Sequence, residues 1–295
     1  MRTLTPSWRR TVASARATAR AVLVAQGLRP PGRAVAVIEG DTFVVSYPKS
    51  GNTWVRFLLA TLLHRDDVDF TNIGRLVPDI YQSTQKQLDR LEPPRLLKSH
   101  EYFDARYRRV IYLVRDPRDV AVSYFHHLVK QRVMPEDCTL ERYLDGFLVG
   151  SYDPYGSWHE NVGSWLGARG GHEDFLLVRY EDLSRRPLQE LQRVVGFIGL
   201  EHSEAQLRAA LCACSAERMR ELESRQARLT ATLKDSRQDI PFIRSAKVGG
   251  WADELPARLA ARITRAWGRT MAELGYLDAQ NGSAAGPVRA RARTG

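Results

Sequence analysis

A short buried strand that runs into a tight turn and then into a helix is the feature that most limits how this chain can fold. Residues 42–47 read Thr-Phe-Val-Val-Ser-Tyr, a β-branched and aromatic run that is typical of a buried strand. Pro48 ends this run, because proline has no N–H to give to a sheet ladder. An apolar helix is predicted over 54–63. Strand, turn and helix in direct succession favour an α/β fold.

The turn between this strand and this helix predicts a site for an anion. Lys49, Ser50 and Gly51 form the turn, and either Asn52 or Thr53 is expected to cap the helix. Backbone N–H groups point into such a turn, the helix dipole adds positive potential, and a lysine with hydroxyls completes the pocket. An ordinary turn with an exposed lysine has the same local pattern. The Walker order of Gly-Lys-[Ser/Thr] is absent, since Lys49 precedes Gly51, which is the only glycine of this turn.

Strands and helices are predicted to alternate along the rest of the chain. The run 110–114 is apolar throughout, as in a central parallel strand. Residues 64–94 predict irregular structure with short helices. Further strands are predicted over 95–99 and 175–180, and further helices over 117–130, 139–149, 155–168, 188–198, 203–222 and 256–274. This order predicts an α/β fold, with a P-loop-like parallel sheet flanked by helices on both faces in a single domain.

Polar side chains stand where the predicted strands end. Lys49 follows the first strand, Lys98 and His100 end the second, Arg115 follows the third and Tyr180 ends the fourth. Because the carboxyl ends of parallel strands meet at one edge of a sheet, we expect these residues to line one crevice. Two lysines, an arginine and a histidine suit a polyanion and a group that must lose a proton. Without a carboxylate cluster, no metal site is predicted.

The net charge of +10 is concentrated at the two ends of the chain. Residues 1–33 hold seven arginines and no acid, and residues 279–295 hold three more and no acid, which together equal the whole excess. A charged tail is most often solvated, so no specific nucleic-acid partner is expected. The predicted division is a flexible basic extension (1–34), a folded domain (35–278) and a disordered basic tail (279–295).

Cysteine usage and hydropathy predict a cytoplasmic protein. Cys138, Cys212 and Cys214 form no C-x-x-C pair, so neither a disulfide framework nor a zinc site is expected. No apolar run approaches the length of a membrane span, and no signal-peptide pattern is present. The sequence gives no indication of the oligomeric state.

Five short segments match motifs of one enzyme family, in that family's order. They are 47–54 (Tyr-Pro-Lys-Ser-Gly-Asn-Thr-Trp), 97–100 (Leu-Lys-Ser-His), 110–124 (ending Val-Ala-Val-Ser-Tyr), 179–183 (Arg-Tyr-Glu-Asp-Leu) and 242–251 (Phe-Ile-Arg-Ser-Ala-Lys-Val-Gly-Gly-Trp). They resemble, in turn, the 5′-phosphosulfate loop, the Lys-Thr-His segment, the 3′-phosphate motif, the adenine-contacting segment and the late Arg-Lys-Gly-x-x-Gly-Asp-Trp motif of sulfotransferases that use 3′-phosphoadenosine 5′-phosphosulfate (PAPS). The ordered set is more specific than any single motif.

The resemblance implies PAPS as co-substrate, adenosine 3′,5′-bisphosphate (PAP) as product, and no metal. Lys49 would contact the sulfuryl oxygens, Lys98 would stabilise charge during in-line transfer, and His100 would act as general base. The 3′-phosphate would be held by an arginine and a serine of the third motif. The implied cofactor-binding residues are Lys49, Ser50, Gly51, Asn52, Thr53, Trp54, Arg115, Ser123, Tyr180, Arg244, Ser245, Ala246 and Lys247.

The sequence departs from the family pattern at several positions. Asn52 stands where the phosphosulfate loop commonly has Thr. Ser245 and Ala246 stand where the late motif has Lys and Gly, and Gly250 stands where it has Asp. Lys247 would supply the lost cation from a shifted position. The dimer motif of cytosolic members is absent after the final tryptophan, so that mode of dimerisation is not predicted.

The leading hypothesis is a sulfotransferase that acts on a hydroxyl (or amine) of a small-molecule acceptor. A P-loop-type nucleotide kinase and a non-catalytic nucleotide- or nucleic-acid-binding protein are the alternatives. The kinase requires the Gly-Lys-[Ser/Thr] order and a carboxylate for Mg²⁺, which the sequence does not display. The acceptor pocket is expected from 64–94, 125–160 and 222–243, where the resemblance is weakest.

Overall fold

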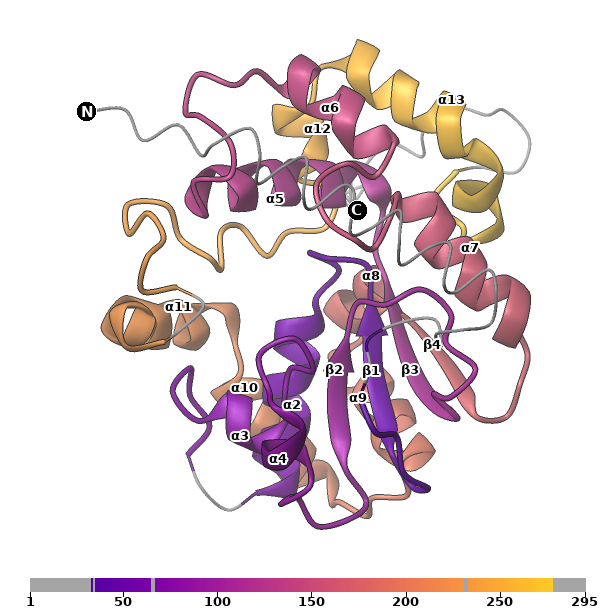
Figure 1. The fold of residues 1–295 in the computed structure, drawn as a ribbon, viewed down its shortest axis with the longest axis vertical. Coiled ribbons are helices and arrows are strands. Elements are labelled where there is room, and N and C mark those ends of the chain that lie inside the picture. Colours follow the sequence, from indigo (N-terminus) through magenta and orange to yellow (C-terminus); the bar gives the residue numbers. More distant parts are fainter. Residues whose placement is uncertain (1–32, 34, 65–66, 231–232, 278–295) are drawn as a thin grey trace, which may run out of the picture.

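The computed structural model describes residues 33, 35–64, 67–230 and 233–277. Over these ranges a parallel sheet lies between two layers of helices in one domain, as predicted (Figure 1). The predicted basic tail (279–295) and the predicted N-terminal extension, apart from its Arg33, lie outside the described residues.

The sheet has four parallel strands in the order β2-β1-β3-β4. They are β1 (Thr42–Ser46), β2 (Leu96–Ser99), β3 (Arg109–Val114) and β4 (Phe175–Arg179), each within a residue or two of its predicted bounds. The chain goes from β1 to one edge of the sheet, and from β3 to the other edge. The carboxyl ends of β1 and β3 therefore flank the switch point, where open α/β sheets bind ligands.

Alternating side chains of the strands face two separate hydrophobic cores. In β1, Phe43 and Val45 belong to the first core and Val44 to the second, because successive side chains of a strand point to opposite faces. The first core is covered by α5 (Pro117–Lys130), α6 (Leu140–Leu148), α7 (Trp158–Arg169) and α13 (Ala257–Glu273). The second core is covered by α2 (Asn52–Leu63), α9 (Pro187–Phe197), α10 (Glu204–Ala213) and α11 (Ala216–Gln226).

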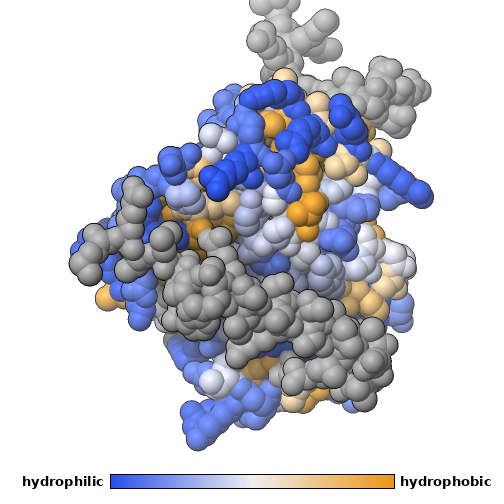
Figure 2. Space-filling model, turned by 45° about the horizontal axis from the view of Figure 1, so that its top comes forward, coloured by the Kyte–Doolittle hydropathy of each residue, from blue (hydrophilic) through white to orange (hydrophobic). Residues whose placement is uncertain are grey.

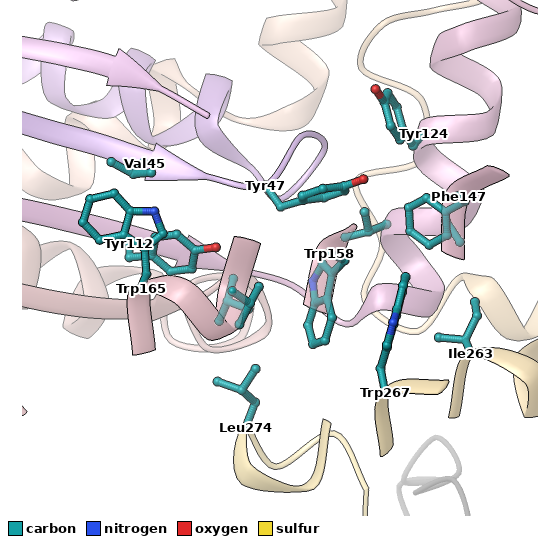
Figure 3. Packing of buried hydrophobic residues seen from close by; sticks show 14 of the residues in the cluster. Val45, Tyr47, Tyr112, Tyr124, Phe147, Trp158, Trp165, Ile263, Trp267 and Leu274 are labelled. Carbon is teal, nitrogen blue, oxygen red and sulfur yellow. The ribbon is translucent and has the colours of Figure 1, made fainter. Parts of the chain in front are cut away.

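Tryptophan side chains in the first core reach the backbone at the strand ends. Trp158 stacks on Trp267, with ring centroids 5.6 Å apart, and Figure 3 shows the pair deep among the buried aromatic residues. The Trp158 indole N–H donates to the carbonyl of Arg115 at 3.2 Å. Trp165 donates in the same way to the carbonyl of Glu101 at 3.0 Å. The core thus fixes the backbone that follows β2 and β3, where the predicted site residues lie.

Two helix predictions were wrong in their extent. The helix predicted over 203–222 is two helices, because the hydroxyl of Ser215 accepts the N–H of Arg218 and starts α11 afresh. Helix α7 begins three residues later than predicted, since Ser157 and Glu160 form a capping box. The shorter elements are α3 (Ile73–Leu76), α4 (Gln85–Leu88), α8 (Tyr180–Arg185), η1 (Ala227–Leu229) and α12 (Trp251–Glu254).

Exposed apolar side chains are scattered over the described surface. The face in Figure 2 carries hydrophilic residues around small, separate hydrophobic patches. The large apolar residues that are exposed are Ile38, Leu63, Val133, Val149 and Leu229. A search of the described residues for a helix that is long and apolar enough to cross a membrane finds none.

A buried ion pair joins the residues just before β1 and β2. It lies at the amino ends of the strands, whereas the predicted site lies at their carboxyl ends. The guanidinium of Arg95 donates to both carboxylate oxygens of Asp41, at 2.7 and 2.6 Å, and each side chain is 1% exposed. Removing one partner of such a pair leaves a buried charge uncompensated.

We therefore expect Asp41→Asn to lower the free energy of unfolding by about 3–5 kcal/mol. Urea denaturation measures this change. Arg208→Gln, which breaks the exposed Arg208–Glu204 pair on α10, is the control and should cost about 1 kcal/mol or less. Equal effects of the two substitutions would contradict the assignment of Asp41 as a buried partner.

Candidate functional site

A cavity of about 770 Å³ lies at the carboxyl ends of the strands. Its wall brings together residues that the sequence placed at four different strand ends and in the late motif. The predicted site residues on this wall are Lys49, Gly51, Asn52, Thr53, Trp54, Lys98, His100, Arg115, Ser123, Tyr180, Arg244, Ser245 and Ala246. Two predicted residues are not on the wall, namely Ser50, which is buried, and Lys247, whose side chain is exposed.

The turn after β1 has a left-handed backbone that only certain residues adopt easily. Lys49 has φ +67° and Gly51 has φ +96°. A Cβ on Gly51 would lie 2.7 Å from Cδ2 of Tyr180, so the turn requires glycine for its conformation and for its space. A non-glycine residue at positive φ, such as Lys49, is strained and is typical of functional sites.

The prediction that Asn52 or Thr53 caps α2 was wrong. The cap position is Gly51, and no side chain caps the helix. Instead, the Asn52 amide donates to the carbonyl of Val44 at 3.1 Å and to the Ser46 hydroxyl at 3.2 Å. These bonds tie the turn back to β1. The first N–H groups of the helix therefore have no side-chain acceptor, which leaves them available to a ligand.

Lys49 is half-buried on the cavity wall, and its ammonium has no counter-ion among the described residues. None of the described residues forms a hydrogen bond or ion pair with it, and it lies over the ring of Phe242, 4.2 Å from the ring centroid. Burial, followed by the charge of Arg115, lowers the pKa of Lys49 to about 7. A half-buried cation on a cavity wall without a paired anion is suited to receive one.

The ammonium of Lys98 is satisfied by a carboxylate that the sequence analysis missed. It donates to Asp79 at 2.8 Å, and the same carboxylate accepts the backbone N–H of Tyr81. Burial lowers the pKa of Lys98 to about 8, and the charge of Asp79 opposes this fall. Asp79 belongs to no local sequence motif. It lies beside Lys98 only because the two residues form an isolated parallel β-bridge in the folded protein.

His100 presents one unprotonated nitrogen. Its Nδ1 lies 2.6 Å from the carbonyl of Ser46. A carbonyl can only accept, so Nδ1 carries the hydrogen and Nε2 keeps its lone pair. Burial and then the charge of Lys98 lower the pKa of His100 to about 3, so the ring is neutral at pH 7. The rings of Tyr81 and Tyr155 lie beside it, with centroids 6.2 and 5.4 Å away.

Arg115 holds the late motif against the strand ends. Its guanidinium lies over the ring of Tyr180 at 4.3 Å and donates to the carbonyl of Lys247 at 2.8 Å. The Tyr180 hydroxyl donates to the carbonyl of Ala246 at 3.0 Å. Asp119 accepts two N–H groups of the same loop, from Gly249 and Trp251. The loop meets Arg115 through the backbone of Lys247, whereas the sequence expected the ammonium of that residue to contribute.

One face of α5 forms a wall of the cavity. Asp119, Ser123 and His127 all lie on this wall, and their spacing of four residues places them on one side of a helix. This spacing is the signal that could have identified Asp119 and His127 from the sequence. Arg244 lines the cavity and forms an ion pair with Glu254.

The three segments expected to build the acceptor pocket all contribute to the cavity wall. Tyr81 and Tyr155, two aromatic residues of these segments, lie on the wall. Four other aromatic residues of the segments pack into or against the first core, namely Phe125, Phe147, Tyr152 and Trp158. Sequence reasoning did not single out Arg56 or Phe57, which also line the cavity. No three His, Cys, Asp or Glu side chains form a metal-binding group within the described ranges.

Comparisons with known proteins identify relatives over most of the chain. Residues 39–275 match the family model described as the sulfotransferase domain. Sulfotransferase 1B1 of the mouse (Mus musculus) is 32% identical over 231 residues, which are 72% of this chain and 76% of that protein. The 3-beta-hydroxysteroid sulfotransferase of the guinea pig (Cavia porcellus) is 29% identical and covers 80% of this chain and 85% of its own.

Solved structures share the fold at lower identity. A mouse sulfotransferase complexed with PAP is 22% identical and has a TM-score of 0.67, covering 82% of this chain and 87% of its own. Retinol dehydratase in complex with androsterone and PAP is 21% identical and has a TM-score of 0.62, covering 79% of this chain and 80% of its own.

The glycine requirement of the turn can be tested by substitution. We expect Gly51→Ala to lower the free energy of unfolding by about 1–3 kcal/mol, since it adds backbone strain and a clash with Tyr180. Gly163→Ala is the matched control, because Gly163 lies in α7 with no neighbour within 4 Å of an added Cβ. It should raise the free energy of unfolding by about 0.5–1 kcal/mol. Urea denaturation measures both, and a stabilised Gly51→Ala protein would refute the described turn.

Proposed function

Because this chain belongs to the sulfotransferase family, we propose that it transfers a sulfuryl group from PAPS to a hydroxyl (or amine) of a small-molecule acceptor and releases PAP. The observation that carries this proposal is the half-buried ammonium of Lys49, which has no counter-ion among the described residues and lies in the turn just before α2. The named relatives are sulfotransferases, and two solved neighbours hold PAP.

The nucleotide would lie across the switch point of the sheet. Lys49 and the backbone N–H groups of residues 50–53 would hold the 5′-phosphosulfate, as at other helix N-termini. Arg115 would hold the 3′-phosphate with its planar fork, together with Ser123. The rings of Trp54 and Tyr180 lie edge to face at 5.9 Å, and we propose that they contact the adenine. Arg244, Ser245, Ala246 and Lys247 would contribute through the late-motif loop.

The chemical step would be an in-line displacement at sulfur. The acceptor oxygen forms a bond to sulfur while the bond from sulfur to the 5′-phosphate oxygen breaks, and that oxygen keeps the electron pair. His100 would take the acceptor proton at Nε2, because Nδ1 is occupied by Ser46. Lys49 and Lys98 would stabilise the charge that moves towards the leaving phosphate.

Other features of the sequence remain part of the proposal. We propose a single catalytic domain over 35–278, a cytoplasmic location and small-molecule acceptors, without a specific nucleic-acid partner. The aromatic surroundings of His100 support an acceptor that carries an apolar group beside its hydroxyl or amine.

A test of the general base separates binding from turnover. We expect His100→Ala to keep PAP affinity within a few-fold and to lower kcat by about 10²–10⁴-fold, because only the proton acceptor is lost. Calorimetry measures PAP binding, and release of PAP measures turnover with the best acceptor from a panel of phenols and alcohols. The exposed His172 serves as control through His172→Ala, which should behave as wild type. Unchanged kcat in His100→Ala would remove His100 from the mechanism.

The lowered pKa of Lys49 predicts proton uptake when PAP binds. Free Lys49 has a pKa of about 7, and a bound phosphate raises it, since an opposite charge favours the protonated amine. Affinity for PAP should therefore fall as the pH rises above 7, by up to about tenfold per unit. Calorimetry at pH 8 in buffers of different ionisation enthalpy measures the proton uptake.

The matched variants assign this uptake to one residue. Lys49→Arg carries a permanent charge, so the proton uptake due to residue 49 should disappear. Lys234→Arg, at an exposed position, should retain the wild-type uptake. Undiminished uptake in Lys49→Arg would show that another group titrates.

A further inference from the structure

Phe242 occupies a central position in the cavity that no step of the proposed mechanism uses. Its ring lies over the Lys49 ammonium, with 4.2 Å from Nζ to the ring centroid. The rings of His127 and Phe70 meet it edge to face, at 5.8 and 6.4 Å. Phe242 thus lays an apolar surface against one side of the Lys49 ammonium and brings no hydrogen-bonding group to it, while both residues remain on the cavity wall.

A buried ion pair fixes the backbone on which Phe242 stands. The carboxylate of Glu223 on α11 accepts the N–H groups of Phe242 and Ile243. The ammonium of Lys130 on α5 lies 3.6 Å from the same carboxylate and donates to the carbonyls of Arg237 and Ile240. Two helices that belong to different layers therefore hold this segment in place. The ring is held over Lys49 by groups that lie outside the cavity.

Water competes with the acceptor at a sulfuryl donor. In that reaction a water oxygen forms a bond to sulfur, the bond from sulfur to the 5′-phosphate oxygen breaks, and that oxygen keeps the electron pair. The products are PAP, sulfate and protons. The protons pass through His100 to solvent. Closed active sites suppress such reactions by excluding water. On the side of Lys49 that Phe242 occupies, the ring presents only carbon and hydrogen to the ammonium, so it offers a water molecule no hydrogen-bonding partner there.

We propose that Phe242 is a positioning residue that keeps water away from the sulfuryl group, so that the group passes to the acceptor and not to water. This inference rests on the proposed function, because it assigns Phe242 a role beside the group that Lys49 binds. It predicts an activity that the wild-type protein suppresses, namely hydrolysis of PAPS without an acceptor.

Release of labelled sulfate from PAPS in the absence of any acceptor tests the proposal. We expect Phe242→Ala to raise this rate at saturating PAPS by about tenfold, because the cover over Lys49 is removed. Phe242→Leu keeps an apolar cover and should show a smaller rise. Glu223→Gln removes one of the two carboxylate oxygens that accept the N–H groups of Phe242 and Ile243, and it should shift hydrolysis in the same direction without replacing a residue of the cavity wall. Phe103→Ala, in the aromatic contact with Trp165, controls for general loss of packing and should not raise hydrolysis.

The outcomes separate this inference from the function beneath it. A rise in hydrolysis in the Phe242 and Glu223 variants, with PAP affinity retained, supports the water-excluding role. Wild-type hydrolysis rates in variants that still bind PAP would overturn it and leave the proposed function intact. A wild-type protein that neither binds PAP nor consumes PAPS would overturn both.

Discussion

A half-buried ammonium group that has no counter-ion among the described residues is the constraint on which the rest of the site depends. The left-handed turn after β1 holds Lys49 at the carboxyl edge of the sheet, with Phe242 over it and Arg115 nearby. An isolated charge in such a place either loses its proton or acquires an anion. The unoccupied N–H groups at the start of α2 favour the anion. The free protein is therefore arranged around a charge that its ligand must supply.

The other strand-end groups already have hydrogen-bond partners within the protein, and these partners differ from one group to the next. Lys98 is paired with Asp79, so it is a fixed cation whose place does not depend on the ligand. Arg115 gives a hydrogen bond to the late-motif loop and keeps a face against Tyr180. His100 donates to Ser46 and is left with one lone pair. In the proposed mechanism Lys49 and Arg115 bind the nucleotide, Lys98 stabilises charge and His100 accepts a proton, which is the set that sulfuryl transfer needs.

The sequence predicted the features that depend on local pattern. Apolar runs predicted the strands and their parallel direction. The geometry of parallel sheets then predicted that Lys49, His100 and Arg115 lie around one crevice. Features that depend on distant partners could not be predicted. From the sequence Asn52 is expected to cap the helix, but its side-chain amide instead donates to the carbonyl of Val44 in β1. Asp79 has no motif because its role exists only once its segment pairs with β2. The exposure of the Lys247 side chain could not be predicted either. It follows from the hydrogen bond by which Arg115 holds the backbone carbonyl of Lys247.

A crystal structure of the protein with PAP bound is the most direct test of the central claim. The account predicts the 5′-phosphate within hydrogen-bond distance of Lys49 Nζ and of the N–H groups of the turn. It also predicts the 3′-phosphate beside Arg115, and Nε2 of His100 facing the space left for an acceptor. A bisphosphate bound elsewhere, or a cavity that stays empty at saturating PAP, would contradict the account.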